Sequence, residues 1–367
     1  MRGPVAQGGS KAGIPSLCLL GIVILLLVGC GTGGNDGTEP TQADSKAKSK
    51  PAEVSSPADK PQPPKCPSRS DSIGVTLDGE PGAENVGFLM AEQRGYFADA
   101  GLTVGVAGPW TPKRPVRYVA TGVDTIGITQ QPQLVLAREE GVPIVSVGSV
   151  IRQPTAALIW LRGSGIRDLA DLKGKTVAIP GVPFQEDFLA AVLARAGLTL
   201  EDVDVKPVSY KAVAALRHGR ADAIFGSWNI EGKALEAQGA EPVIKRVQGL
   251  GLPDYEELVV IARKECVRKH PGMIRRFMAA VARGTKAARE DREAAVNRIA
   301  EYHGFDREFS KQTLRAQLDV TLPLLATHAR MDRARARRLT AWMHEEGMID
   351  REPPFKDLFA ANSSSKP

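Results

Sequence analysis

Residues 124–150 read DTIGITQQPQLVLAREEGVPIVSVGSV and decide the fold class. The pattern predicts a strand at 124–128, a helix at 131–140 that ends at Gly141, and an apolar strand at 143–150. A strand, a helix of about ten residues and a second strand form a βαβ unit, and such units build parallel sheets with helices on their faces. The stretch therefore predicts an α/β protein.

The same alternation continues on both sides of this stretch. Toward the N-terminus it predicts strands at 73–77 and 102–106, with helices at 85–100 and 114–120. After residue 172 the alternation starts again. This second series predicts strands at 176–179, 203–208, 223–225 and 258–262, with helices at 184–196, 211–218 and 231–238. Beyond Pro271 the sequence is helical almost throughout.

Two series of strands and helices predict two doubly wound lobes. Strands near 156–161 and 258–262 link the lobes, so that lobe 1 comprises 71–160 plus 261–360, with the C-terminal helices, and lobe 2 comprises 161–260. Two crossings leave a cleft with a hinge, and such clefts commonly bind small molecules. The expected fold is α/β, with two lobes joined by two crossover strands.

An export signal is predicted at the N-terminus. The apolar run 17–28 follows Arg2 and Lys11 and is shorter than the roughly 20 residues that a membrane-spanning helix needs. It ends in Gly29-Cys30, the pattern of a bacterial lipobox. Residues 1–29 are therefore expected to be cleaved and Cys30 to carry a lipid. The alternative is an ordinary anchor helix with an incidental cysteine.

A linker is predicted to follow the lipidated cysteine. Residues 31–70 contain seven prolines and a single large aliphatic residue, Val54. Such a segment cannot bury enough apolar surface to offset its ordering entropy, and its prolines keep it extended. We therefore expect residues 30–70 to be a disordered linker that tethers the body to the outer face of the cell membrane.

Charge and cysteine content fit an exported protein. The formal net charge of +6 falls to +4 when Arg2 and Lys11 leave with the signal, and this mild charge argues against nucleic-acid binding. Cys18 leaves with the signal and Cys30 is taken by the lipid. For the remaining Cys66 and Cys266, a disulfide and two free thiols are both open.

The sequence contains none of the common catalytic or metal-binding motifs. It has no G-x-S-x-G, Walker or H-E-x-x-H motif, and its five histidines lack metal-ligand spacing. We therefore expect a binding protein with no catalytic residue, no metal and no cofactor.

Two segments resemble periplasmic substrate-binding proteins of ABC importers, a class that takes up sulfonates, nitrate-like anions and thiamine precursors. Residues 88–102, FLMAEQRGYFADAGL, resemble their first-helix signature, and residues 166–181, IRDLADLKGKTVAIPG, resemble the entry into their second lobe. Two further segments are similar to the thiamine-pyrimidine-precursor branch, which also contains the fungal thiamine pyrimidine synthases. They are GSWNIEG at 226–232 and GLPDYEEL at 251–258. The resemblance covers roughly residues 73–300.

This resemblance implies a pocket for a hydroxymethyl- or formylaminomethyl-aminopyrimidine, a flat ring with an amino donor and ring-nitrogen acceptors. Trp228 is expected to supply a stacking face, Glu231 to accept from the exocyclic amine, and Asn229 to donate and accept. Each has a structural alternative: a core position for Trp228, an N-cap for Asn229, and a favourable place in the helix dipole for Glu231.

Other candidates come from further strand ends and loops, because the C-terminal ends of strands line the ligand crevice of open α/β sheets. They are Gln130, Gln131, Phe184, Trp110 and Tyr255. The alternatives are a helix-start role for the two glutamines, a hydrophobic staple for Phe184 and a hinge role for Tyr255.

One departure from the family pattern concerns the first strand. That strand usually ends in Asp-Trp, with an Asn soon after, whereas this chain has Leu77-Asp78-Gly79. Asp78 is kept, Asn85 is the expected substitute for the Asn, and the aromatic wall is missing.

The preferred function is a monomeric, lipid-anchored receptor that delivers a thiamine pyrimidine precursor to an ABC permease and its ATPase. A receptor for an alkanesulfonate, taurine, nitrate or a riboflavin-like ligand is the alternative, with Lys113, Arg114 and Arg152 as its basic candidates. A pyrimidine synthase is the remote alternative, because the fungal enzymes carry a clustered cysteine motif that this sequence lacks.

Overall fold

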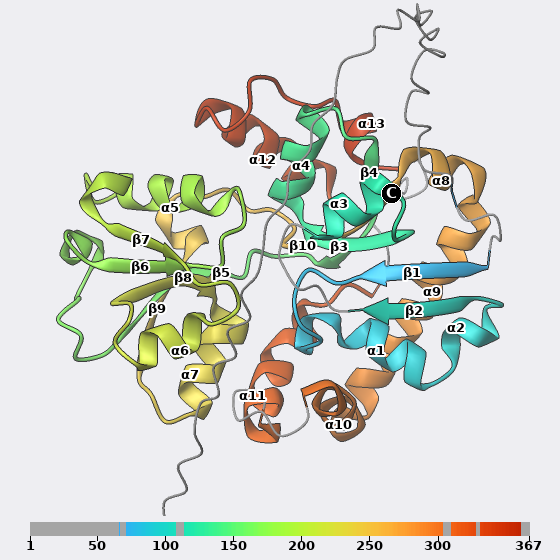
Figure 1. Cartoon of the computed structure of the whole chain (residues 1–367), viewed down its shortest axis with the longest axis horizontal. Coiled ribbons are helices and arrows are strands. Elements are labelled where there is room, and N and C mark those ends of the chain that lie inside the picture. Colours follow the sequence, from blue (N-terminus) through green and yellow to red (C-terminus); the bar gives the residue numbers. More distant parts are fainter. Residues whose placement is uncertain (1–65, 67–70, 108–113, 304–309, 328–330, 361–367) are drawn as a thin grey trace, which may run out of the picture. The chain divides into compact units, whose positions relative to one another are not determined.

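The computed structural model describes residue 66 and residues 71–107, 114–303, 310–327 and 331–360. These residues form two five-stranded sheets with helices around them (Figure 1). The predicted α/β fold with two lobes is confirmed. Cys30 and Trp110, two of the predicted functional residues, lie outside the described residues.

The first sheet has the strand order β2-β1-β3-β10-β4. Strand β1 runs parallel to β2 and β3, whereas β10 runs antiparallel to β3 and β4. The strands are β1 (Ser72–Thr76), β2 (Thr103–Ala107), β3 (Ile126–Gln130), β4 (Ile144–Ile151) and β10 (Leu258–Arg263).

The second sheet repeats this plan with the order β7-β6-β8-β5-β9. Strand β6 runs parallel to β7 and β8, whereas β5 runs antiparallel to β8 and β9. The strands are β5 (Ala156–Leu161), β6 (Thr176–Ile179), β7 (Asp204–Pro207), β8 (Ala223–Ser227) and β9 (Pro242–Arg246).

The prediction of parallel sheets was wrong for one strand in each lobe. Strand β5 enters the second sheet from the first lobe, and β10 returns to the first sheet, so neither arrives through a helical crossover that would make it parallel. The predicted lobe boundaries at 160 and 260 both fall inside these strands. The chain instead crosses before β5 and before β10. Strand β9, a half-exposed edge strand, was not predicted.

Helices cover both faces of each sheet (Figure 1). Helices α3 and α4 pack on one face of the first sheet, and α1 and α9 pack on the other. Helix α5 covers one face of the second sheet, and α6 and α7 cover the other. The bounds are α1 (Val86–Gln93), α2 (Tyr96–Asp99), α3 (Arg114–Thr121), α4 (Gln131–Glu139), α5 (Gln185–Ala194), α6 (Ala212–Arg217) and α7 (Lys233–Ala237).

The predicted helix at 85–100 is broken. Gly95 has φ of +71°, a left-handed conformation that glycine adopts without steric cost, and it separates α1 from α2. Short helices flank the sheets elsewhere. They are the 3-10 turns η1 (Ala83–Asn85), η2 (Leu169–Leu172), η3 (Leu200–Asp202), η5 (Val247–Leu250) and η7 (Leu322–Leu324), and the π turn η4 (Trp228–Gly232).

The C-terminal part is helical, as predicted. Its helices contact both lobes. Helix α11 packs against α7, and the ring of Trp342 in α12 lies edge-on to Phe188 of α5, with ring centroids 5.1 Å apart. The bounds are α8 (Lys264–Lys269), α9 (Pro271–Glu290), α10 (Arg292–His303), α11 (Lys311–Thr321), α12 (Arg333–Glu345) and α13 (Phe355–Leu358).

Cys66 and Cys266 form a disulfide, with their Cα atoms 5.4 Å apart. The bond joins the last part of the predicted linker to α8. Within the described part of the chain, no helix combines the length and the apolar character that crossing a membrane requires.

Candidate functional site

A cavity of about 160 Å³ lies between the two lobes, at the ends of strands from both sheets. A cavity of about 150 Å³ holds a benzene ring in a protein core, so this one suits a single small heteroaromatic ring. Residues of both lobes line it: Asp78, Gly79, Glu80, Gly82, Ala83, Glu84, Asn85, Gln130, Ala156, Pro180, Val182, Phe184, Gln185, Tyr210, Phe225, Gly226, Ser227, Ile230, Glu231, Glu257 and Gln317.

Strand ends place these side chains. Asp78 follows β1, Gln130 ends β3 and Ser227 ends β8, so each lies at the carboxyl edge of its parallel strands. Glu257 precedes β10. Because β10 runs antiparallel to β3, the start of β10 lies at the same edge as the end of β3.

Carboxylates dominate the polar wall of the cavity. Asp78 is 8% exposed and accepts a hydrogen bond from Asn85 at 3.3 Å. Burial raises the pKa of Asp78 to about 6, although the bond from Asn85 opposes the rise. The carboxylate is therefore poorly solvated and would gain from a ligand that donates hydrogen bonds to it.

Glu84 and Glu257 are also buried carboxylates whose pKa values are raised. Burial raises the pKa of Glu84 well above its usual range, and the nearby Asp78 charge adds to the rise. Burial also raises the pKa of Glu257, although that carboxylate accepts bonds from the Thr155 amide at 2.7 Å and the Tyr255 hydroxyl at 3.2 Å. Among the described residues, none of those that line the cavity is Lys, Arg or His.

Glu231 reaches the cavity from the π turn η4. Its Oε2 accepts the Ser227 amide at 2.7 Å. Gly226 allows this fold-back, because a Cβ at that position would come within 3.2 Å of the Glu231 carboxyl group. The Glu231 carboxylate is thus held over the end of β8.

Aromatic rings form other parts of the wall. Phe184 and Phe225 are almost fully buried, and Phe184 lies edge-on to Phe188 with centroids 4.9 Å apart. Tyr210 adds a partly exposed ring whose hydroxyl donates to the backbone oxygen of Asp78 at 2.7 Å. These rings offer the flat contact that a heteroaromatic ligand requires.

The structure brings five predicted site residues together at the cavity. They are Asp78, Asn85, Gln130, Phe184 and Glu231. Gln131, Trp228, Asn229 and Tyr255 do not line it. Gln131 accepts the Glu256 amide at 2.9 Å, and Tyr255 is fully buried against Phe188, with centroids 5.8 Å apart.

Trp228 does not supply the expected stacking face. Its ring packs in the core under α6 and α7, and the Arg246 guanidinium lies over it at 3.8 Å from the centroid. Asn229 bonds across the lobes to Glu84 at 3.1 Å and to Thr321 at 3.0 Å instead of capping a helix. The π turn is the reason, since it directs Ile230 and Glu231 to the cavity and Trp228 to the core.

Several cavity residues were not predicted from the sequence. Glu84 lies one residue before the predicted helix start, and Glu257 lies in the quoted segment 251–258, where only Tyr255 was chosen. Tyr210 follows β7, so the rule that strand ends line the crevice could have found it. The same rule applies to Phe225, which ends the predicted strand 223–225, and Gln185 follows the chosen Phe184, whereas Gln317 in α11 carried no comparable signal.

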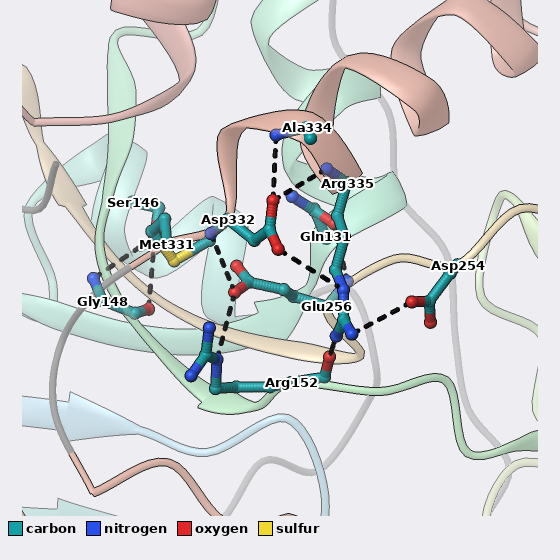
Figure 2. Close-up of polar contacts among 10 residues, drawn as sticks. All are labelled: Gln131, Ser146, Gly148, Arg152, Asp254, Glu256, Met331, Asp332, Ala334 and Arg335. Carbon is teal, nitrogen blue, oxygen red and sulfur yellow. Dashed lines mark hydrogen bonds and ion pairs between the residues drawn. The ribbon is translucent and has the colours of Figure 1, made fainter. Parts of the chain in front are cut away.

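A second polar cluster lies beside the cavity at the two crossings (Figure 2). Glu256 is fully buried, and its Oε1 lies 3.8 Å from Nε of Arg152 and accepts the Asp332 amide at 3.2 Å. Burial raises the pKa of Glu256 to about 7. Unlike the cavity carboxylates, Glu256 faces arginine.

Arg335 joins this cluster to α12. Its guanidinium donates to the backbone oxygen of Arg152 and pairs with Asp254 at 3.0 Å, so it contacts both crossings (Figure 2). Asp332 caps α12 by accepting the amides of Ala334 and Arg335 at 2.9 and 3.1 Å. The N-terminus of α12 is therefore fixed to the hinge.

Comparison with known proteins identifies the family. The family model "NMT1/THI5 like" matches residues 83–295. The formylaminopyrimidine-binding protein of Halalkalibacterium halodurans is 32% identical over 62% of this chain and 69% of its own length. The 4-amino-5-hydroxymethyl-2-methylpyrimidine phosphate synthase of Schizosaccharomyces pombe is 27% identical over 63% of this chain and 68% of its own length.

Solved structures agree on the fold. The periplasmic aliphatic sulphonate binding protein SsuA from Escherichia coli superposes with a TM-score of 0.63 at 17% identity, over 81% of this chain and 94% of its own. This likeness establishes the two-lobed periplasmic-binding-protein fold. By its sequence the chain belongs to the NMT1/THI5-like family.

Proposed function

We propose that the protein is the extracytoplasmic substrate-binding component of an ABC importer and binds a thiamine pyrimidine precursor. The ligand class is a hydroxymethyl- or formylaminomethyl-aminopyrimidine. One observation carries the proposal: the cavity between the lobes combines aromatic walls with carboxylate and amide side chains, and none of its lining residues in the described part of the chain is basic.

The chemistry of the wall matches the edge of an aminopyrimidine. An exocyclic amine donates two hydrogen bonds, and Glu231, Asp78 and Glu257 can accept them. Ring nitrogens accept hydrogen bonds, and the amides of Asn85, Gln130 and Gln185 can donate them. Desolvated carboxylates gain most from such a partner, because hydrogen bonds to a charged group are stronger than neutral ones.

The same wall argues against the anionic alternatives. A sulfonate or nitrate needs donors or positive charge, whereas the cavity offers Asp78, Glu80, Glu84, Glu231 and Glu257. Of the predicted basic candidates, Arg152 faces Glu256 at the hinge, Arg114 lies near the Tyr118 ring, and Lys113 is outside the described residues. The sulfonate receptor therefore shares the fold alone.

Titration calorimetry tests the proposal directly. We expect 4-amino-5-hydroxymethyl-2-methylpyrimidine or its formylaminomethyl analogue to bind at micromolar concentration or below, and taurine and nitrate not to bind. The phosphate ester of the pyrimidine should bind at least about 10-fold more weakly, because the lining carboxylates repel it. If neither pyrimidine binds at micromolar concentration, the proposal fails.

A matched pair of variants locates the ligand. Glu231→Gln should weaken pyrimidine binding on the order of 10-fold or more, because it removes a charged acceptor from the cavity wall. Glu236→Gln makes the same chemical change at an exposed position of α7, where Glu236 pairs with Lys233 at 2.6 Å, and should leave binding unchanged. Equal effects of the two changes would place the ligand elsewhere.

We also propose that the protein binds without catalysis, although relatives include a synthase. The support is the cysteine content: the four cysteines lie at 18, 30, 66 and 266, and the last two form a disulfide. The sequence therefore contains no clustered cysteine motif of the kind that the fungal enzymes carry. Recovery of the bound pyrimidine chemically unchanged after prolonged incubation is the expected result.

Membrane attachment through Cys30 completes the proposed function. Residues 1–29 are proposed as the signal, Cys30 as the lipidated residue and 30–70 as the linker that lets a monomeric body reach its permease. The support is the lipobox-like Gly29-Cys30 and the proline-rich composition that follows. Cys30→Ser should move the protein from the membrane fraction to the soluble fraction.

A further inference from the structure

Tyr210 joins the two lobes across the cavity. It lies in the turn between β7 and α6 of the second lobe, and its hydroxyl donates to the backbone oxygen of Asp78 in the first lobe at 2.7 Å. This is the usual length of a well-formed O–H···O bond. Tyr210 also lines the cavity, so one side chain covers the ligand space and holds the lobes together.

The backbone before Tyr210 is unusual. Ser209 has φ of +53° and is the one residue other than glycine with positive φ in the described part of the chain. This conformation is unfavourable for a residue with a Cβ and persists only where the surrounding structure enforces it. Because Ser209 immediately precedes Tyr210, it fixes the direction in which the tyrosine leaves the turn.

The acceptor side suits a contact that forms and breaks. The acceptor is a backbone carbonyl, so the carboxylate of Asp78 stays directed to Asn85 and the cavity. Gly79 follows, and a Cβ built there would lie 3.8 Å from the Tyr210 ring, within van der Waals range. The tyrosine ring thus lies against a smooth glycine backbone.

Asn229 provides a useful contrast. It also bonds across the lobes, to Glu84 at 3.1 Å, but it is fully buried and is held by Thr321 of α11 as well. Tyr210 is partly exposed. The contact at the exposed rim of the cavity is the one that solvent can replace first.

We propose that Tyr210 is a positioning residue that controls ligand release, since the bond from its hydroxyl to the Asp78 carbonyl must break before the ligand leaves. This inference rests on the proposed function. Association begins in the open form, which lacks this bond, so loss of the hydroxyl should speed dissociation more than it slows association.

Stopped-flow measurements with 4-amino-5-hydroxymethyl-2-methylpyrimidine test the split between the two rates. Tyr210→Phe keeps the ring and should raise the dissociation rate on the order of 10-fold, as expected for one net hydrogen bond, with the association rate changed less than about two-fold. Tyr96→Phe makes the same change on α2 and should alter neither rate. If Tyr210→Phe slows association and leaves the dissociation rate unchanged, the proposal is overturned.

Two changes at Ser209 test the role of the backbone. Ser209→Gly allows positive φ without strain and should leave both rates as in the wild type. Ser209→Val disfavours that φ, because its Cβ is branched, and should reproduce the faster dissociation of Tyr210→Phe. Wild-type rates in Ser209→Val would remove the backbone from the proposal.

A readout without ligand separates this inference from the proposed function. Small-angle X-ray scattering of the unliganded protein should show a larger radius of gyration for Tyr210→Phe than for the wild type and Tyr96→Phe, because the lobes open more often. If the wild type binds no pyrimidine, the proposed function fails while scattering still judges the lobe contact. An unchanged radius of gyration together with unchanged rates would overturn the role of Tyr210.

Discussion

Glu256 and Glu257 are neighbours in the sequence and belong to two different sites. Glu256 faces the hinge, where Arg152 lies 3.8 Å away and the Asp332 amide donates to it. Glu257 faces the cavity, where its carboxylate accepts from the Thr155 amide and the Tyr255 hydroxyl. The two neighbouring side chains therefore contact different groups, one at the hinge and one at the cavity.

The carboxylates at the hinge stabilise the structure, whereas those at the cavity line the ligand site. At the hinge, carboxylates meet arginines, so the charges compensate each other and fix α12 to the crossings. At the cavity, Asp78 and Glu257 accept hydrogen bonds from neutral donors, and none of the lining residues that the structure describes is basic. A buried carboxylate without a cation is costly, and a ligand with amine donors can lower that cost. We therefore expect the cavity carboxylates to gain hydrogen-bond donors when a ligand binds.

Reduction of the disulfide should give the largest loss of stability and no loss of binding. The Cys66–Cys266 bond spans 200 residues, and a loop of this length implies a stabilisation of up to about 5 kcal/mol through the unfolded chain. Urea unfolding with and without reductant measures it, and a Cys66→Ser/Cys266→Ser double variant is the control. A matching loss of ligand affinity would show that stability and binding are coupled, which would weaken the comparison.

The pH dependence of stability should show both sites. The pKa of Glu256 rises from 4.5 to about 7 on folding, so its contribution to stability is fully present below pH 4.5 and is lost as the pH rises through 7. The loss amounts to about 3 kcal/mol. Asp78, whose pKa rises from 3.8 to about 6, should contribute a similar loss between pH 4 and 6.

Saturating pyrimidine should then distinguish the two carboxyl groups. A ligand that donates to Asp78 removes its share of the loss, so ligand-induced stabilisation should grow between pH 4 and 6. Glu256→Gln should flatten the pH dependence of stability in the unliganded protein and keep the growth of ligand-induced stabilisation between pH 4 and 6. Asp78→Asn should abolish that growth. Chemical unfolding across the pH range measures each case, and retained growth in Asp78→Asn would contradict the assignment.

The sequence predicted most of the fold, and half of the residues that it proposed for the site line the cavity. Alternating strands and helices predicted both lobes, and the rule for strand ends placed Asp78, Gln130 and Glu231 at the crevice. It could not show which strands run antiparallel, because the direction of β10 depends on its return from the other lobe. Without that direction, Glu257 could not be assigned to the cavity edge.

Local geometry explains the other misses. A regular helix start after β8 would have left Trp228 near the ligand, but a π turn occupies residues 228–232 and turns that ring into the core. Glu84 was missed because the helical segment begins with η1 at Ala83, two residues before the predicted helix start. These errors come from backbone details that hydrophobic periodicity does not encode.

Replacing each of the two neighbouring glutamates by glutamine tests the comparison between the hinge and the cavity. Glu257→Gln should lower pyrimidine affinity by about 10- to 100-fold, the value of a hydrogen bond to a charged group. Glu256→Gln should change affinity by less than about two-fold, because its carboxylate faces arginine and not ligand. Calorimetry on the two variants gives the result, and comparable losses would mean that the hinge cluster contributes to the ligand site.

The smallest effect is expected at Trp228, which the sequence favoured as the stacking residue. Trp228→Phe keeps an aromatic side chain in the core beneath Arg246 and should change ligand affinity by less than about two-fold. Phe184→Leu removes an aromatic ring from the cavity wall and should weaken binding by several-fold, since a ring contact contributes about 0.5–1.5 kcal/mol beyond its buried area. A larger loss of affinity in Trp228→Phe than in Phe184→Leu would return the stacking role to Trp228. In a variant that stays folded, the loss of a ring weakens binding only where that ring contacts the ligand.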